Sequence, residues 1–206
     1  MAKSAADVFL ALQGRYIKLD RTSAKVNKLH AVGKISAFDV EQIYSGIYLD
    51  AFVSLERFIE DLFLGYVSGQ VTLPTKAAKP LVTISPSSKA KEVMLGGKNF
   101  LDWIPYDANT KKRAQIYFNG NSSFLSLSKQ DENLLGQLHQ IRNALAHRST
   151  HSIGVFHRLV VGNLPIVPRD KRPGNFLRTI FRANPSQTRL QYYLFEMLEI
   201  AKRLSE

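Results

Sequence analysis

Three side chains suited to phosphate chemistry lie close together in the stretch "LHQIRNALAHRST" (138–150): Arg142, Asn143 and His147. An imidazole takes up or supplies a proton near neutral pH, because the unperturbed pKa of histidine is about 6.5. A guanidinium stays charged, holds a phosphate and stabilises the negative charge that builds on it during reaction. An asparagine amide orients either group through hydrogen bonds. Together these groups suit cleavage of RNA without a metal ion.

The three residues lie near the end of a predicted helix. Ser128 and Asp131 form a capping box, in which the hydroxyl and the carboxylate each satisfy an N–H group of the first turn. Apolar residues then recur at the helical period: Leu134, Leu138, Ile141 and Leu145. The dipole of a helix favours cations at its C-terminus by roughly 0.3–1 kcal/mol. The cluster therefore also has a structural interpretation, as the basic end of a helix.

The spacing of Arg142 and His147 raises a geometric difficulty. On an ideal helix the two residues lie about 140° apart around the axis, so one straight helix does not point both at the same spot. The two side chains converge if the helix frays near His147, or if two copies of the helix meet across a two-fold axis. We expect the second arrangement, a site shared by two subunits.

A second long helix is predicted between residue 36 and the glycines at 65 and 69. Ser36 and Asp39 form a capping box at its start, and Ile35 and Val40 are spaced as a hydrophobic staple across that cap. Apolar residues then follow the helical period: Val40, Tyr44, Ile47, Ala51, Leu55, Phe58 and Leu62. We expect a helix of about eight turns.

The rest of the chain predicts a mainly α protein, an antiparallel helical bundle in one domain over 1–206. Further helices are expected at 5–19, at 109–118 after a shorter one, and at 186–204. Irregular insertions are expected at about 69–97 and 151–185 because both are rich in proline and glycine. Short strands are expected within them at 81–84, 155–161 and 176–181.

The composition excludes several classes of protein. The chain has no cysteine, which rules out disulfides, thiolate metal sites and cysteine nucleophiles. No apolar run approaches the roughly 20 residues that span a bilayer, so we expect a soluble cytoplasmic protein with no membrane partner. His147 and His151 are four residues apart, but no carboxylate stands at a matching spacing, so we expect no metal and no other cofactor. Trp103, Tyr106 and Tyr117 are expected in core or dimer packing.

The charge of the chain favours a polyanionic partner. The net charge is +11, and Lys and Arg release counterions when they bind phosphates. Residues 36–63 hold six acidic side chains and one arginine, whereas 158–189 hold seven Lys or Arg and one Asp. Such a run is usually a solvated surface, but its mixture with phenylalanines in a loop-rich segment also suits contact with RNA. The candidate RNA-binding residues are Arg148, Arg169, Lys171, Arg172, Arg178 and Arg182.

The stretch RNALAH (142–147) resembles the motif of the HEPN superfamily, in which an arginine, usually followed by a polar residue, stands four to six residues before a histidine. The earlier stretch FVSLERFIEDLF (52–63) is similar to the aromatic- and Glu-bearing helix of larger HEPN proteins. The tyrosine that follows the motif in toxins silenced by a nucleotidyltransferase is absent, since Arg148 and Ser149 follow His147. The resemblance therefore argues against that particular pairing.

The resemblance implies a metal-independent endoribonuclease, active as a homodimer with the two motifs facing each other. Arg142 and His147 would be catalytic, Asn143 would support them, and Glu56 would face the same cleft. Many HEPN proteins act as toxins or in antiphage defence, which implies an antitoxin or a defence-system partner. Two alternatives stay open: an inactive HEPN module that binds nucleic acid or serves as a scaffold, and an interaction domain with no role in RNA.

Overall fold

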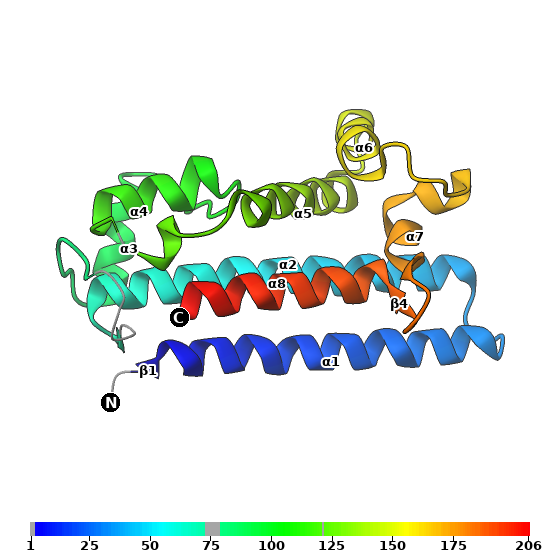
Figure 1. The fold of residues 1–206 in the computed structure, drawn as a ribbon, viewed down its shortest axis with the longest axis horizontal. Helices are drawn as coiled ribbons and strands as arrows, with labels where there is room; N and C mark the ends of the chain where they lie inside the picture. The colour runs from blue at the N-terminus through cyan, green and yellow to red at the C-terminus, as the bar shows by residue number, and fades with distance from the viewer. Residues whose placement is uncertain (1–2, 73–78, 121) are drawn as a thin grey trace. The chain divides into compact units, whose positions relative to one another are not determined.

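The computed structural model describes residues 3–72, 79–120 and 122–206, and helices dominate them (Figure 1). The α-helices are α1 (Ala5–Ala31), α2 (Ala37–Ser68), α3 (Ser87–Leu95), α4 (Lys112–Tyr117), α5 (Lys129–His147), α6 (Thr150–Phe156), α7 (Pro173–Arg178) and α8 (Arg189–Ser205). Single helical turns of other pitch are η1 (Asp107–Lys111), η2 (Ser123–Leu125), η3 (His157–Val161) and η4 (Pro168–Lys171). The strands pair as β1 (Lys3–Ser4) parallel to β2 (Val71–Thr72), and β3 (Ile180–Arg182) antiparallel to β4 (Gln187–Thr188). The predicted mainly helical fold is confirmed.

The chain divides into two compact units. The first comprises Met1–Gln13, Ser54–Gly136 and Leu198–Glu206, and the second comprises Gly14–Val53 and Gln137–Met197. No helix within the described ranges is both long enough and apolar enough to cross a membrane.

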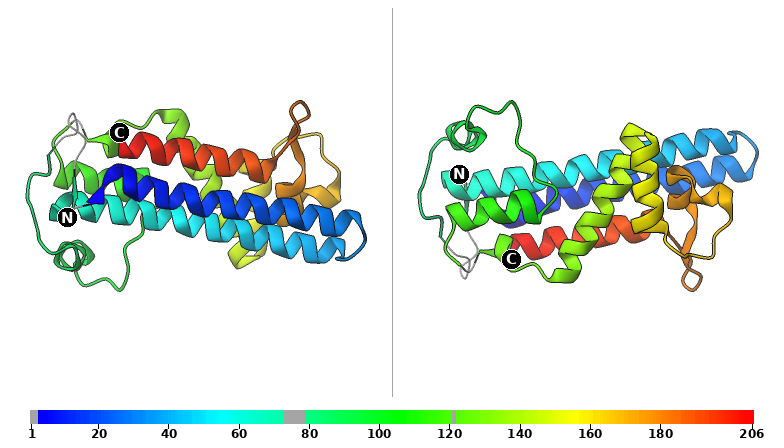
Figure 2. Two further views of the ribbon diagram at one scale, coloured as in Figure 1. Left: turned by 90° about the horizontal axis from the view of Figure 1, so that it is seen from below. Right: turned by 90° about the horizontal axis from the view of Figure 1, so that it is seen from above.

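In the second unit, α1 and α2 lie antiparallel and side by side (Figures 1 and 2). The turn between them contains Gly33, whose φ of +70° favours glycine. The predicted capping box then starts α2: the backbone N–H of Ser36 donates to Asp39 Oδ2 at 2.8 Å, and the N–H of Asp39 donates to Ser36 Oγ at 3.1 Å. The buried hydroxyl of Tyr16 on α1 donates to the carbonyl of Ala51 on α2 at 2.8 Å, which fixes the two helices in register.

The core of the first unit is an aromatic cluster around Phe63 on α2. The ring centroids of Trp103, Phe118 and Phe124 lie 5.1, 5.0 and 4.9 Å from the centroid of Phe63. The indole N–H of Trp103 donates to a carboxylate oxygen of Glu60 at 2.8 Å, so its one polar atom is satisfied. This confirms the prediction that Trp103 is a core residue.

Tyr106 is buried in the same unit, while Tyr117 packs half-buried at its edge. The hydroxyl of Tyr106 donates to the carbonyl of Phe124 at 2.9 Å. Burial raises the pKa of Tyr106 well above its ordinary value, so the phenol stays protonated as a hydrogen-bond donor.

Several boundaries predicted for the shorter elements are wrong. The first helix does not end at residue 19 but continues to Ala31, because its buried face repeats through Leu19, Ser23 and Val26. Residues 81–84 form no strand, although an isolated bridge joins Pro80 to Phe118 nearby.

The segments on either side of the Gly96-Gly97 pair also differ from expectation. The helix α3, which follows Pro86, was expected as loop, and it buries Ala90. The short helix expected before residue 109 is absent, since the described residues 98–104 have no regular structure. The helix expected at 109–118 is confirmed as η1 followed by α4. A break in the helices was expected at residues 119–121, and one of these residues, Asn121, lies outside the described residues.

The insertion at 151–185 is more helical than its composition predicts. Residues 155–161 are not a strand but the end of α6 followed by η3. The β-branched residues in this stretch favour a strand, but two features favour the helix instead. Ser149 Oγ caps α6 by accepting from the N–H of Ser152 at 3.1 Å, and the side chain of Phe156 is buried. Residues 176–178 are the end of α7, so only the last part of the strand expected at 176–181 is correct, as β3.

The position of α7 depends on Gly174, which packs directly against α2. A Cβ at Gly174 would lie 2.6 Å from the hydroxyl oxygen of Ser45, 2.7 Å from Cγ of Glu41 and 2.8 Å from the carbonyl oxygen of Glu41. These distances are far below ordinary contact, so only glycine lets α7 approach this closely. The approach brings the basic residues of this segment next to the first turns of α2.

Candidate active site

The predicted catalytic pair meets at the C-terminal end of α5. Nη1 of Arg142 lies 3.1 Å from Nε2 of His147, within hydrogen-bond distance. A guanidinium only donates, so Nε2 of His147 accepts through its lone pair and the ring proton is on Nδ1. The side chain of His147 is exposed, whereas Arg142 is half-buried. The pair therefore presents a charged donor and a neutral acceptor to solvent.

The prediction that one helix does not bring Arg142 and His147 together is wrong. Both residues belong to α5, which remains helical through His147, and the contact forms within one chain. The separation of about 140° describes where the two side chains leave the helix, whereas the long arginine side chain carries its guanidinium around the helix to a residue five positions on. A second subunit is therefore not required to bring these two groups together.

Asn143 extends the contact into a chain of hydrogen bonds. Its Oδ1 accepts from Nη1 of Arg142 at 3.1 Å, which fixes the orientation of the amide because a guanidinium only donates. Its Nδ2 then lies 3.2 Å from Nε2 of His139, as a donor to the lone pair of that ring. The ring of His139 in turn stacks on Phe52, with centroids 6.3 Å apart and planes 21° apart. The predicted supporting residue thus contacts the same nitrogen of Arg142 that contacts His147.

The site is positioned by the buried face of α5. Leu138, Ile141 and Leu145 are buried, as the apolar stripe predicts. The hydroxyl of Tyr48 on α2 donates to the carbonyl of Leu138 at 2.9 Å, in the interior. Burial, with Tyr193 and Tyr16 nearby, raises the pKa of Tyr48 well above its ordinary value, so this donor is present at any working pH. The opposite face of α5 is thereby held outward with its polar side chains.

Arg148 ends α5 immediately after the site. Its φ of +49° is left-handed, the conformation that commonly stops a helix. Its Nη2 donates to Oε1 of Gln42 on α2 at 3.0 Å, which ties the end of the site to a second helix. The next helix, α6, starts two residues later with Ser149 as its cap. His147 and His151 consequently lie on different helices, so their spacing of four residues does not place them on one helix face.

Glu56 lies on α2 in the first unit, where its side chain is half-buried. Arg142 and His147 belong to the second unit. A role for Glu56 at the catalytic pair stays a prediction.

The candidate RNA-binding residues are distributed over the segment that follows α5. Arg169 and Lys171 lie on η4, Arg172 lies between η4 and α7, and Arg178 ends α7. Arg169 and Arg172 are exposed, and Lys171 and Arg178 are half-buried.

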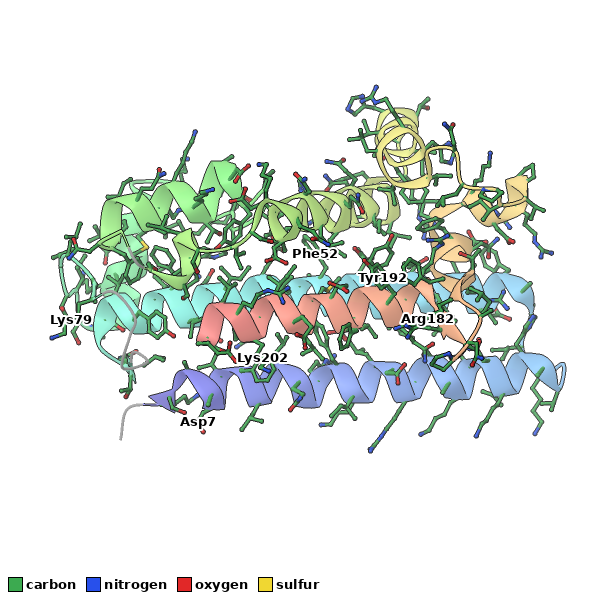
Figure 3. The ribbon with its side chains drawn as sticks, in the orientation of Figure 1. Asp7, Phe52, Lys79, Arg182, Tyr192 and Lys202 are labelled. Carbon is green, nitrogen blue, oxygen red and sulfur yellow. The ribbon has the colours of Figure 1, made fainter. Side chains whose placement is uncertain are left out.

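Arg182 is also exposed, on β3 (Figure 3). Its neighbour Phe181 stacks on Tyr192 of α8, with ring centroids 4.0 Å apart, and remains 45% exposed. An aromatic face beside an exposed arginine suits a single-stranded nucleic acid.

His139, Gln42 and Tyr48 were not predicted as part of the site. His139 stands four residues before Asn143, a spacing that places both on one face of a helix, so the sequence contained a signal for it. Gln42 and Tyr48 come from a helix distant in sequence, and only the packed structure reveals their contacts.

Comparisons of the chain with protein-family models, curated proteins and solved structures found no match.

Proposed function

We propose that this protein is an endoribonuclease that cuts RNA without a metal ion, with His147 as proton acceptor and Arg142 as the residue that holds the phosphate. The observation that carries the proposal is the 3.1 Å contact between Nη1 of Arg142 and Nε2 of His147. It brings a permanent cation and a proton acceptor to one point at the exposed end of a helix. RNA supplies its own nucleophile, the 2′-hydroxyl, so a proton acceptor and a phosphate-holding cation are the groups that this reaction asks of the protein.

The contact also suggests how RNA would engage the site. A phosphate oxygen is a stronger acceptor for a guanidinium than a neutral imidazole is, so a bound phosphodiester displaces the ring from Arg142. Nε2 of His147 is then free beside the phosphate and takes the proton of the 2′-hydroxyl. The 2′-oxygen forms a bond to phosphorus, the bond from phosphorus to the 5′-oxygen breaks, and the 5′-oxygen takes a proton from water. The hydroxide that is left takes the proton from His147, which restores the neutral imidazole. The products are a 2′,3′-cyclic phosphate and a 5′-hydroxyl.

The test of this function is cleavage of a mixed RNA by the purified protein in EDTA, followed by analysis of the new ends. Cyclic phosphate ends are expected, and His147→Ala and Arg142→Ala should each lower the rate about 100-fold or more. His151→Ala is the matched control, since that exposed histidine lies on α6. Cleavage that persists in both site variants would overturn the assignment.

The homodimer that the resemblance implies is a separate part of the proposal. Because the pair meets within one chain, each subunit would carry its own Arg142 and His147, and the partner would complete the RNA-binding surface. Mixing Arg142→Ala with His147→Ala protein distinguishes the arrangements. Restored activity in the mixture would mean that a working site takes Arg142 from one chain and His147 from the other. If both residues of a site come from one chain, the mixture stays inactive. Light scattering on the same samples gives the number of subunits.

A role as a toxin or defence effector follows if the protein cuts cellular RNA. Expression in bacteria should then arrest growth with the wild type and not with His147→Ala, and a neutralising partner would relieve the arrest. Normal growth with an RNase-active wild type would exclude toxicity under those conditions.

A second candidate function, an RNA-binding module without catalysis, is favoured by the arginines of η4, α7 and β3, since they serve binding without His147. Binding by such a module falls steeply with salt, survives His147→Ala and is accompanied by no cleavage.

A further inference from the structure

The second unit contains a hollow of about 320 Å³ beside the first turn of α2, formed with η4 and α7. Its lining includes three arginines, Arg169, Arg172 and Arg178, and two carboxylates, Glu41 and Asp170. The volume is at the lower end of the range of small-molecule sites, roughly 300–1,000 Å³. The hollow is therefore large enough for a small ligand and rich in cations.

Two of the three arginines are already paired. Nη2 of Arg172 lies 3.2 Å from a carboxylate oxygen of Glu41, and Nε of Arg169 lies 3.6 Å from a carboxylate oxygen of Asp170. The guanidinium of Arg178 makes no hydrogen bond or ion pair with any residue in the described ranges, and this side chain is half-buried. Glu41 and Asp170 line the same hollow, but each is paired with another arginine, so Arg178 is the cation left to hold a bound anion.

The remaining walls suit a nucleoside. Phe38 is 67% exposed and lines the hollow, so its ring offers a flat apolar face. His30 also lines it, and its Nδ1 donates to the carbonyl of Ile35 at 3.1 Å. That bond leaves Nε2 of His30 as an acceptor for a hydroxyl group. Charge for a phosphate, an aromatic face for a base and an acceptor for a sugar hydroxyl thus share one hollow.

We propose that this hollow binds the phosphomonoester of a nucleotide, with Arg178 as the principal phosphate ligand and Phe38 against the base. A phosphomonoester carries a charge of about −1.5 to −2 at neutral pH, which exceeds what one free arginine neutralises. The exposed guanidinium of Arg172 is the second donor, and it keeps Glu41 as its partner on the other side. The same chemistry belongs to a free mononucleotide and to the 5′-phosphate end of an RNA strand.

The hollow is separate from the catalytic pair but shares its support on α2. Glu41 lines the hollow, and the next residue, Gln42, accepts from Arg148 at the end of α5. The nucleotide site does not depend on the proposed cleavage, because none of its residues takes part in proton transfer. Binding can therefore be measured whether or not the protein cuts RNA.

The test is calorimetric titration of the wild type with AMP, adenosine and inorganic phosphate. AMP should bind about tenfold or more tightly than adenosine, and Arg178→Ala should weaken AMP by a similar factor. Arg158→Ala is the matched control, an exposed arginine on η3 that does not line the hollow, and it should bind AMP as the wild type does. Equal binding of AMP and adenosine, or equal losses in the two arginine variants, would overturn the proposal.

Two further measurements keep the test decisive. Phe38→Ala, at an exposed position, should weaken the binding of AMP and leave the binding of inorganic phosphate unchanged. Equal binding of AMP to this variant and to the wild type would contradict the role of Phe38. Short RNAs with a 5′-phosphate or a 5′-hydroxyl, titrated into His147→Ala protein, identify the source of the phosphate. Tighter binding of the phosphorylated strand supports a strand end, and binding of AMP alone supports a free nucleotide.

Discussion

Nη1 of Arg142 lies 3.1 Å from Nε2 of His147, and the donor in this contact is the guanidinium. Since Nε2 is the acceptor, the ring of His147 should carry its proton on Nδ1 when it is neutral. Long-range proton–nitrogen NMR spectra of the imidazole at alkaline pH should show this tautomer in the wild type and lose the preference in Arg142→Ala. The exposed His151 serves as an internal control, and an Nε2-protonated His147 in the wild type would contradict the contact.

The left-handed backbone at Arg148 predicts an unusual order of stability for two substitutions. Arg148→Ala and Arg148→Gly both remove the hydrogen bond to Gln42, but only glycine adopts a φ of +49° without strain. In urea unfolding the glycine variant should therefore be more stable than the alanine variant by about 1 kcal/mol. An alanine variant that is equally stable would mean that α5 ends in another conformation.

The close approach at Gly174 predicts a contrast between two glycines. Gly174→Ala forces a methyl group against Ser45 and the backbone of Glu41, and should destabilise the protein by about 1–3 kcal/mol. Gly154→Ala, on α6, meets nothing within 4 Å and should be neutral or stabilising by up to about 1 kcal/mol. Thermal unfolding of the two variants beside the wild type measures the contrast, and similar effects would rule out the tight packing of α7 on α2.

Glu132 in the first unit predicts a pH-dependent contribution to stability. Its carboxylate is 4% exposed and accepts from Lys111, and from Lys129 at 3.1 Å. The hydrogen bond from Lys111, and then that from Lys129, lowers the pKa of Glu132 below its ordinary value of 4.5, against the opposing effect of burial. A lowered pKa in the folded state stabilises the fold at neutral pH, and this stabilisation is lost as the pH falls through that pKa.

Glu132→Gln should therefore destabilise the protein by about 2 kcal/mol at pH 7, as loss of hydrogen bonds to a charged group does. The difference from the wild type should narrow once the pH falls below 4.5, the ordinary value for glutamate. Glu92→Gln is the matched control, because Glu92 and its partner Lys89 are both exposed and their pair is weak. A Glu132→Gln penalty that does not change between pH 7 and acid would contradict the ionised pair.

The long helices and their starts could be predicted from the sequence because their signals are local. The capping boxes at Ser36 and Ser128 need residues three positions apart, and both form as expected. The helix α6 could not be predicted in the same way, since residues 155–161 contain β-branched side chains typical of strands. Its helix follows from the cap at Ser149 and from burial of Phe156, and burial depends on the rest of the fold.

For the candidate site, the sequence identified the residues but not how they meet. Arg142, Asn143 and His147 were recognisable by type and spacing, whereas their contact depends on the rotamer of a long side chain. Three arginines of the hollow were predicted to bind RNA, but the hollow itself had no sequence signal. It arises because residues 30–41 and 169–179 meet in space, and that meeting depends on the missing side chain of Gly174.

Arg148 binds Gln42 and Arg172 binds Glu41, so the stretch 149–171 departs from and returns to consecutive residues of α2. Anchors at neighbouring residues of one helix close this stretch into a loop on α2, so its two ends stay together when exposed residues between them change. Changes at its exposed positions are therefore expected to cost little folding stability, whereas changes at the buried Phe156 and Val161 are costly. The Arg142–His147 pair lies outside this loop and is supported from the interior by Tyr48.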